Sequence, residues 1–556
     1  MRLFALLTFL LCSSSLLGQI VVGGKQFERS LTESGPKGEW VVYEKGAPQN
    51  DGTRRWLTKR VLVELAPGTP AASLAQVAGV TQTSARGKYA VVEFAGSADA
   101  AIKGAASLLK APGVRSAAPM LSHQLFHRFV PNDPYVAYNA ANPGYQWHLS
   151  NTGQNGAVAG SDLNVLSVWD SYKGTGVRIA IVDDGLEVGH PDLAPNVDLS
   201  HSFDFNDNDS DPSPGATNFH GTSCAGVAAA RGNNGIGGSG VAPEATLVGL
   251  RLIAAPTSDQ QEADAFAYQK DLIAVKSNSW GPYDGAFGSG GPDVLSAQAL
   301  EDAATTGRNG KGTVFLWAAG NGNGSGDDSN YDGWANSIHA IAVSAMNDKG
   351  RSSYYSEPGA NILVCAPSNG GKEGITTTDR TGALGYNEDG GTVEYPDFTD
   401  SNYTNTFGGT SSATPAVAGV VALMLQANPN LSTRDVQEIL VRSATQNDSY
   451  DGDWITNGAG FHFNIKYGAG LVNAQQATAL ASTWTNVTPR QSHTYAAAAL
   501  NLPIPDYDRS GVSKTFTVPI ADNLRLEHIT VHVKAAHTNR GNLEWRLISP
   551  SGISVR

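Results

Sequence analysis

Cysteine is scarce in this sequence. The chain of 556 residues contains three, and Cys12 lies in an apolar leader at the N-terminus. Only Cys224 and Cys365 then remain for the mature protein, which is too few for a disulfide framework in a chain of this size. We therefore expect stability to come from a large apolar core and, as argued below, from bound cations.

Long apolar runs and positive charge are also in short supply. After the leader, no segment reaches the roughly 18 uninterrupted apolar residues of a membrane-spanning helix, so we expect no membrane anchor. The chain has 38 Lys and Arg against 51 Asp and Glu, a formal net charge of −13. This balance argues against nucleic-acid binding.

The leader itself has the pattern of a targeting segment. It reads MRLFALLTFLLCSSSLLGQ, with one positive residue, an apolar stretch from Leu3 to Leu11, and then small and polar residues. This pattern is typical of a secretory signal peptide, and we predict that residues 1–18 form one. The protein is therefore expected to be secreted, to an extracellular or periplasmic compartment.

Three short motifs carry residue types that can build one catalytic site. They are IAIVDDG at 179–185, HGTSCAG at 220–226 and GTSSATP at 409–415, which contain Asp183, His220 and Ser411. A serine hydroxyl attacks a carbonyl only if a nearby imidazole takes its proton and a carboxylate orients that imidazole. A fourth motif, VFLWAAGNG at 314–322, places Asn321 where its side-chain amide can stabilise an oxyanion.

The residues around these motifs predict where each one lies in a fold. VRIAIV at 177–182 is a β-branched run of the kind found in buried parallel strands, so Asp183 is expected at the carboxyl end of a strand. Open α/β sheets place their chemistry at that edge. Ser411 opens an apolar helical pattern, which predicts a position near the positive end of a helix dipole.

The order Asp, His, Ser along the chain is that of subtilisin, and these motifs resemble those of subtilisin-like serine proteases. The resemblance implies an α/β fold with a doubly wound, mostly parallel sheet, and a serine endopeptidase acting on protein or peptide substrates. In this reading Ser411 is the nucleophile, His220 the general base, and Asp183 the residue that orients it. Asn321 and the Ser411 backbone N–H would form the oxyanion hole.

Three further parts are predicted around the leader and these motifs. Residues 19–128 resemble the small α+β inhibitory propeptide of subtilases. Their compact part, at about 58–122, shows the pattern strand, helix, strand, helix, strand, with the first helix expected over 70–80. Residues 129–480 would form the protease domain. Residues 485–556 show short alternating segments, which predict an all-β sandwich that resembles the P domain of kexin- and furin-like convertases. The sequence stops within that module, so we expect the sandwich to be incomplete.

Acidic residues at defined positions point to the substrate. Asp184 follows Asp183 as in the convertases and is expected to face the substrate. SNSWGPYDG at 277–285 resembles a convertase segment that places Asp284 at the wall of the S1 pocket, and Asp332 falls where a second S1 carboxylate lies. Two desolvated carboxylates select a guanidinium or ammonium group, so the resemblance implies Arg or Lys at P1.

The match is weaker further from the scissile bond. Glu262 and Trp334 fall on an S4 acid and a nearby aromatic residue, but Gly290 stands where another S4-side carboxylate is expected. Thr217 stands where the family has an S2 acid. We therefore expect a P1 preference with weaker demands at P2 and P4.

Calcium is the cofactor that the resemblance implies, since hard cations need clustered oxygen ligands. Two sites are predicted. The first would use Asp133, Asp192 and Asn234 with the carbonyls of Ile236 and Gly238, and the second would use Asp284, Asp327 and Glu357.

Subtilases of this kind cut off their own propeptide, which acts as an inhibitor until then. The connecting segment HQLFHRFVPNDP offers one arginine, so Arg128 is the predicted cleavage point. Two alternatives remain open. One is a broad-specificity subtilase whose acidic residues serve only calcium, and the other is a non-catalytic secreted binding protein that works through its β-module.

Overall fold

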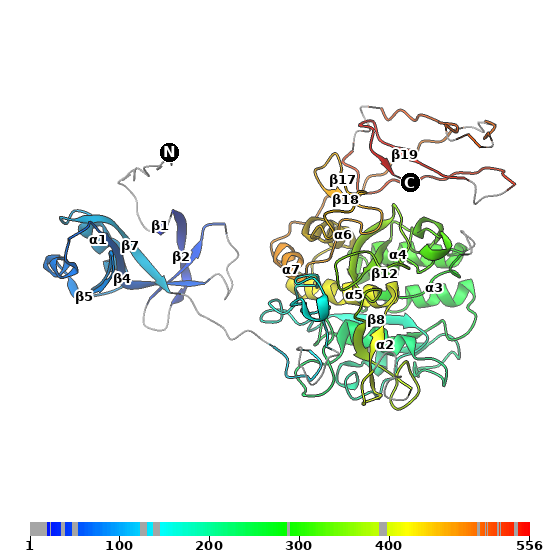
Figure 1. The fold of residues 1–556 in the computed structure, drawn as a ribbon, viewed down its shortest axis with the longest axis horizontal. Helices are drawn as coiled ribbons and strands as arrows, with labels where there is room; N and C mark the ends of the chain where they lie inside the picture. The colour runs from blue at the N-terminus through cyan, green and yellow to red at the C-terminus, as the bar shows by residue number, and fades with distance from the viewer. Residues whose placement is uncertain are drawn as a thin grey trace. The chain divides into compact units, whose positions relative to one another are not determined.

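A computed structural model describes most of the chain (Figure 1). The described residues are 19–22, 24–34, 39–46, 54–122, 130–136, 145–285, 290–388, 397–497, 501–505, 507–508, 510–519, 522, 524–538 and 543–555. They fall in two compact units, Met1–His127 and Arg128–Arg556, which we describe separately. The predicted signal peptide and the predicted cleavage point at Arg128 lie outside the described residues.

The first unit is an antiparallel sheet with one helix packed on it. The strand order is β1-β2-β3-β4-β6-β5, and β7 pairs with β4. Alternate side chains of β4, Val61, Val63 and Leu65, are buried in the same core as Ala101 and Leu108 of α1, because successive side chains of a strand point to opposite faces. The elements are β1 (Gln19–Val22), β2 (Lys25–Ser34), β3 (Trp40–Glu44), β4 (Arg55–Leu65), β5 (Val80–Arg86), β6 (Tyr89–Phe94), α1 (Asp99–Leu108) and β7 (Val114–Ser122).

Two sequence expectations for this unit were wrong in detail. The helix expected over 70–80 is a short 3-10 helix, Ala71–Gln76, and is followed by β5, which had not been expected. The sequence of β5, VTQTSAR, has too few apolar residues to show an alternating pattern. The compact part also begins at residue 19 rather than near 58, since β1, β2 and β3 belong to the same sheet.

The second unit is built on a parallel sheet of seven strands. The strand order is β14-β13-β12-β11-β8-β10-β9, and every neighbouring pair is parallel. β8 lies near the middle, which explains its continuous apolar run. The strands are β8 (Arg178–Asp183), β9 (Phe203–Asp204), β10 (Thr246–Arg251), β11 (Val275–Asn278), β12 (Val314–Ala318), β13 (Ala340–Met346) and β14 (Ile362–Pro367).

Helices cover both faces of this sheet (Figure 1). Ile179 and Ile181 of β8 belong to the core that includes α2 and α5, whereas Ala180 and Val182 pack on the opposite side with residues of α3. This is the doubly wound α/β arrangement that the sequence predicts. The helices are α2 (His220–Ala229), α3 (Asp259–Ala267), α4 (Val294–Gly310), α5 (Thr410–Ala427), α6 (Thr433–Ser443) and α7 (Ala474–Ser482), with two hairpins, β15 (Ile375–Thr378) with β16 (Tyr403–Phe407), and β17 (Ile455–Thr456) with β18 (His462–Phe463).

Helix α5 crosses the centre of the unit. Among the described helices it alone has the length and apolar composition of a membrane span, but 89 % of that window is buried inside the structure. Its apolar side chains pack in the main core beside α2 and the sheet. The helix therefore holds Ser411 on a rigid internal support.

The C-terminal segment, where an incomplete sandwich was expected, has few paired strands among its described residues. The described residues between 485 and 546 form no strand, and only β19 (Leu547–Ile548) and β20 (Ser554–Val555) pair as a short hairpin. Phe516, Val531 and Val533 are about half exposed. A strand persists only if its backbone is paired and its apolar face is covered, and here both conditions fail. The expected sandwich is therefore not assembled in the described part of this segment.

A buried lysine ties strand β11 to the end of helix α3, which gives a stability prediction. Lys276 of β11 is fully buried, and its Nζ donates hydrogen bonds to the carbonyls of Ala265, Phe266 and Tyr268 at the end of α3, at 2.7, 2.7 and 2.9 Å. Lys276→Met should leave these carbonyls without a donor and lower the free energy of unfolding by about 3 kcal/mol. Urea denaturation measures this.

Lys270→Met is the matched control, because Lys270 pairs with Asp302 at the partly exposed surface. It should cost less than about 1 kcal/mol. Equal losses of unfolding free energy in the two variants would show that the hydrogen bonds of Lys276 to the α3 carbonyls stabilise the fold no more than a surface ion pair does.

Candidate active site

The three motif residues meet at the carboxyl edge of the parallel sheet. Asp183 ends β8, His220 begins α2, and Ser411 is the second residue of α5. His220 Nδ1 lies 2.8 Å from Asp183 Oδ1, and the aspartate is only 1 % exposed. His220 and Ser411 lie 37 and 228 positions downstream of Asp183 in the sequence, and the fold brings all three to one edge of the sheet.

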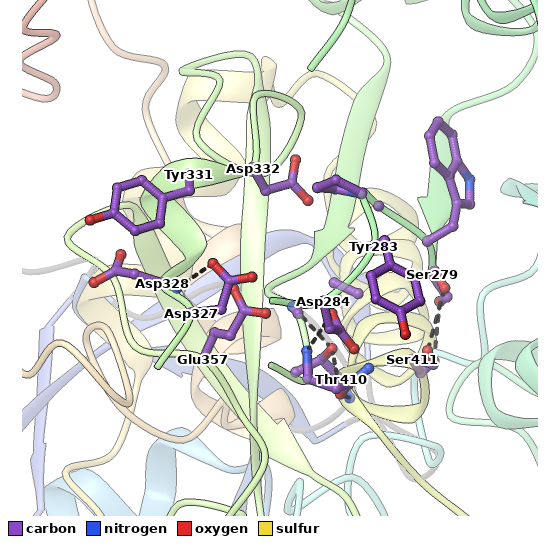
Figure 2. Close-up of a pocket in the computed structure, with 16 residues that line it drawn as sticks. Ser279, Tyr283, Asp284, Asp327, Asp328, Tyr331, Asp332, Glu357, Thr410 and Ser411 are labelled. Carbon is purple, nitrogen blue, oxygen red and sulfur yellow. Dashed lines mark hydrogen bonds between the residues drawn. The ribbon is translucent and has the colours of Figure 1, made fainter. Parts of the chain in front are cut away.

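Ser411 is held by the loop after β11. Its Oγ donates to the carbonyl of Ser279 at 3.3 Å, and Ser279 Oγ donates to the carbonyl of Ser411 at 3.1 Å (Figure 2). This reciprocal pair fixes the start of α5. The Ser411 hydroxyl must therefore exchange the Ser279 carbonyl for the imidazole of His220 as its hydrogen-bond acceptor before it acts as a nucleophile.

The electrostatics of His220 favour its protonated form. Burial alone lowers the pKa of the imidazole, but the carboxylate of Asp183 outweighs burial and raises the pKa well above its ordinary value. With Nδ1–H donated to Asp183, Nε2 is left to accept a proton. Cys224 lies one turn further along α2, with its Sγ 3.8 Å from His220 Nδ1 and 3.6 Å from the Ser411 carbonyl.

Asp184 has a structural role that the sequence did not predict. Its carboxylate accepts hydrogen bonds from the backbone N–H groups of Phe219, His220 and Gly221, at 3.0, 3.2 and 2.8 Å. The first N–H groups of a helix have no partner within the helix, and a carboxylate there also favours the helix dipole. Asp184 therefore caps α2 and positions His220, and its contact with substrate stays a prediction.

Asn321 follows β12 and is oriented by the start of α5. Its Oδ1 accepts hydrogen bonds from the backbone N–H of Thr410 at 2.9 Å and from the Thr410 hydroxyl at 3.1 Å. Because the oxygen is engaged, the Nδ2 group is the part of the amide that is available to donate. Thr410 was not singled out from the sequence, although it lies inside the GTSSATP motif.

A pocket lined by five acidic residues opens beside Ser411 (Figure 2). Asp284 is exposed, whereas Asp327, Asp332 and Glu357 are buried. No lysine, arginine or histidine lines this pocket in the described part of the chain. The fifth acid, Asp328, was not expected from the sequence.

Backbone amides hold these carboxylates in place. Asp332 accepts from the N–H groups of Trp334 and Ala335 at 2.7 and 3.0 Å, and Glu357 accepts from the N–H of Gly322 at 2.9 Å. Burial, helped by the neighbouring acids, raises the pKa of Asp332 to about 6 and that of Glu357 to about 8. Crowded buried carboxylates of this kind are stabilised in their charged forms by a cation.

The residues expected further out lie beside this pocket. Trp334 packs against Trp280, which lines the pocket, with ring centroids 5.5 Å apart. Glu262 on α3 accepts a hydrogen bond from the Thr257 hydroxyl at 3.1 Å, and burial raises its pKa. A Cβ at Gly290 would lie 2.5 Å from the Cβ of Pro282, so the position has no room for a carboxylate.

The residues of the first predicted calcium site converge on one loop. Asp133 and Asp192 are buried, and Asp133 accepts from the N–H groups of Asn233, Asn234 and Gly235 at 2.6, 3.0 and 3.2 Å. Asn234 Nδ2 donates to Asp192 at 2.7 Å. Burial raises the pKa of Asp192 to about 7. Ile236 and Gly238 lie in the same loop, and the N–H of Gly238 donates to Asp192 at 3.1 Å.

Both predicted sites offer only oxygen donors, which is the donor chemistry that calcium prefers. The carboxylates of the second set are not tightly clustered. Asp284, Asp327 and Glu357 line the same pocket, but their ligand oxygens do not all lie within 4.8 Å of one another. Among the described residues, the group of His, Cys, Asp and Glu that meets this distance is Asp183, His220 and Cys224, which already has the role described above.

Comparison with known proteins agrees with this geometry. Residues 174–470 match the subtilase family, and residues 526–556 match the proprotein convertase P-domain. A PC3-like endoprotease of Hydra vulgaris is 38 % identical over 437 residues, which are 76 % of this chain and 57 % of that protein. Bovine furin is 36 % identical over 442 residues, 78 % of this chain and 52 % of furin. The chain thus spans just over half the length of these relatives.

Solved structures show the same relationship. The serine protease of Aeromonas sobria is 30 % identical, with a TM-score of 0.57, over 64 % of this chain and 69 % of that one. A subtilase match over more than half of the chain agrees with the parallel sheet and with the residues gathered at its edge. The chain belongs to the subtilase family, and a segment after its subtilase domain matches the P-domain of the proprotein convertases.

Proposed function

We propose that this protein is a secreted serine endopeptidase that hydrolyses peptide bonds after basic P1 residues. The observation that carries the proposal is the convergence on Ser411 of a buried Asp183–His220 pair, an oriented Asn321 amide and an acid-lined pocket. Nucleophile, base, oxyanion donor and specificity pocket are thus all within reach of one hydroxyl.

The reaction follows from this arrangement. Ser411 Oγ transfers its proton to His220 Nε2 as it bonds to the scissile carbonyl carbon, and the carbonyl oxygen becomes an oxyanion that accepts from Asn321 Nδ2 and the Ser411 N–H. His220 then gives the proton to the leaving amine and the C–N bond breaks. A water molecule repeats the sequence to release the acid product and restore Ser411. Asp183 stabilises the imidazolium at each stage.

The acid pocket supports the basic P1 preference. A guanidinium or ammonium group would supply the cation that the buried Asp332 lacks, and it would come within reach of Asp284 at the mouth. An apolar P1 side chain would leave both carboxylates without a partner. Gly290 and the exposed Thr217 support weak selection at S4 and S2.

Calcium is part of the proposal. Asp133, Asp192 and Asn234, with carbonyls of Ile236 and Gly238, would hold one ion, and Asp284, Asp327 and Glu357 would hold another beneath S1. A bound cation would stabilise these oxygen clusters in their charged forms. Because Asp284 belongs to both the pocket and the second site, occupancy of that site would affect substrate binding.

The same proposal covers processing. Residues 1–18 would be removed as a signal peptide, residues 19–128 would act as an inhibitory propeptide, and residues 129–480 would form the protease domain. The boundary between the two compact units, at His127 and Arg128, supports this division. During self-processing the enzyme would cleave the Arg128–Phe129 bond of its own chain.

The nucleophile can be tested by mutation. Ser411→Ala and His220→Ala should each lower kcat by roughly 10⁶, and the double variant should lose no more, because the two residues act in one step. Asn321→Ala should lower kcat by about 10²–10³ with little change in KM. Steady-state kinetics on a peptide substrate measures each effect, and additive losses in the double variant would contradict a shared mechanism.

The acid pocket has a separate test. Asp332→Asn keeps an oxygen for the N–H groups of Trp334 and Ala335 but removes the charge, so kcat/KM for a P1 Arg peptide should fall about 10- to 100-fold. Asp209→Asn, which changes an exposed acid outside the pocket, is the control and should leave kcat/KM unchanged.

The proposed propeptide cleavage has its own test. N-terminal sequencing of the active form should give Phe129. A start at Phe126 or His127 would favour a broad-specificity subtilase.

Calcium dependence gives the last test of this proposal. Chelation should lower the melting temperature, because an ion bound only by the folded state stabilises it. Glu357→Gln should raise the calcium concentration needed for half-maximal activity, and Asp192→Asn should reduce the thermal shift caused by calcium. If chelation changes neither melting nor cleavage, both metal assignments are wrong.

A further inference from the structure

Three aromatic rings cluster at the side of His220. Phe407, which is buried, lies 5.7 Å from the imidazole between ring centroids. Tyr386 packs edge-on against Phe219 at 4.7 Å and also contacts Phe407 at 5.5 Å. Tyr386 keeps 38 % of its surface exposed, so one aromatic face of this cluster is available to solvent next to the catalytic imidazole.

The loop that carries Tyr386 is fixed from within. Asp379, directly after β15, is fully buried, and its carboxylate accepts hydrogen bonds from the N–H groups of Arg380 and Asn387 at 2.9 and 2.7 Å. Gly385 lies directly against this carboxylate, and a side chain there would collide with it. Asn387 Nδ2 donates to the carbonyls of Phe398 and Tyr403 at 2.8 and 2.9 Å.

The same loop is also tied to the segment that precedes His220. Arg380 Nη1 donates to the carbonyls of Gly215 and Asn218 at 2.8 and 2.7 Å, and the N–H of Thr381 donates to Glu187 at 2.9 Å. The loop that carries Tyr386 is therefore fixed both by hydrogen bonds within itself and by hydrogen bonds to segments near His220. A side chain placed this rigidly while still exposed suits binding of a ligand group.

The aromatic cluster lies beside His220 and outside the acid pocket, which indicates the part of a substrate that it would contact. The acid pocket that would take the P1 side chain is lined by residues around Asp284 and Asn321 and by none of the three aromatic residues. His220 must deliver its proton to the leaving amine, so the residue that carries this amine passes beside the imidazole. Tyr386 contacts Phe407, the ring that lies 5.7 Å from the imidazole, and its exposed surface lies outside the acid pocket.

We propose that Tyr386 forms the wall of the subsite for the first residue after the scissile bond, and that this subsite favours an aromatic side chain. The inference rests on the proposed endopeptidase function. Stacking of an aromatic P1′ ring on Tyr386 adds binding beyond simple area burial. The chain's own proposed cleavage point agrees, because Phe129 follows Arg128.

The test uses two quenched peptides with the same residues up to the bond, Leu-Phe-His-Arg, and either Phe or Ser at P1′. The self-processed, active protein should cleave the Phe peptide with a kcat/KM about five- to ten-fold higher than the Ser peptide. Tyr386→Ala should bring this ratio close to one without changing the Ser peptide more than about two-fold. Tyr386→Phe should keep the ratio, and Tyr386→Leu should give an intermediate value.

Tyr450→Ala, which removes a tyrosine that is 98 % exposed outside the site, should leave the ratio as in the wild type. A ratio that is unaffected by Tyr386→Ala, or equal losses for both peptides, would overturn the assignment. A third peptide with Ala at P2 distinguishes the S2 subsite from the P1′ subsite. If Tyr386→Ala affects only the preference at P2, the P1′ assignment is also overturned. Wild-type protein that cleaves none of the peptides would instead contradict the proposed function.

Discussion

The hydrogen bond between Asp183 and His220 is the constraint on which the rest of this site depends. Asp183 is almost fully buried at the end of β8, where a lone carboxylate is costly. Its Oδ1 accepts from the imidazole and from the Asp184 N–H, while its Oδ2 has no partner among the described residues. The imidazole of His220 is thus the main side-chain partner of this carboxylate, and the same contact raises the pKa of the imidazole.

The surrounding fold keeps this pair in place. Parallel strands end at one edge, so the loops after β8, β11 and β12 bring Asp183, Ser279 and Asn321 together. Asp184 fixes the start of α2, and the Ser279 pair fixes the start of α5. Backbone hydrogen bonds also fix the acid pocket. Its buried carboxylates have no basic partner lining the pocket in the described part of the chain, and backbone N–H groups hold them in positions where they can bind a cation.

Much of this architecture could be predicted from the sequence, because it depends on local patterns. The apolar run before Asp183 and the Gly-Thr-Ser motif at Ser411 indicated the elements that carry them, and the family and the doubly wound sheet are confirmed. The role of Asp184 could not be predicted, because it depends on where α2 begins in space 36 residues later. Tyr386 carries no motif, and only the ring contacts reveal its position.

Other differences have physical causes as well. β5 was missed because its side chains are mainly polar, and β3 could have been found from the run WVVYE. The C-terminal strands were expected from alternation, but alternation alone does not assemble a sheet whose apolar face is uncovered.

The central claim is that Ser411 is an activated nucleophile, and covalent labelling tests it most directly. A fluorophosphonate reagent should react with the folded protein once per molecule, and peptide mass spectrometry should place the adduct on Ser411. His220→Ala and denatured protein should not be labelled. An adduct on another residue, or labelling that survives denaturation, would contradict the account.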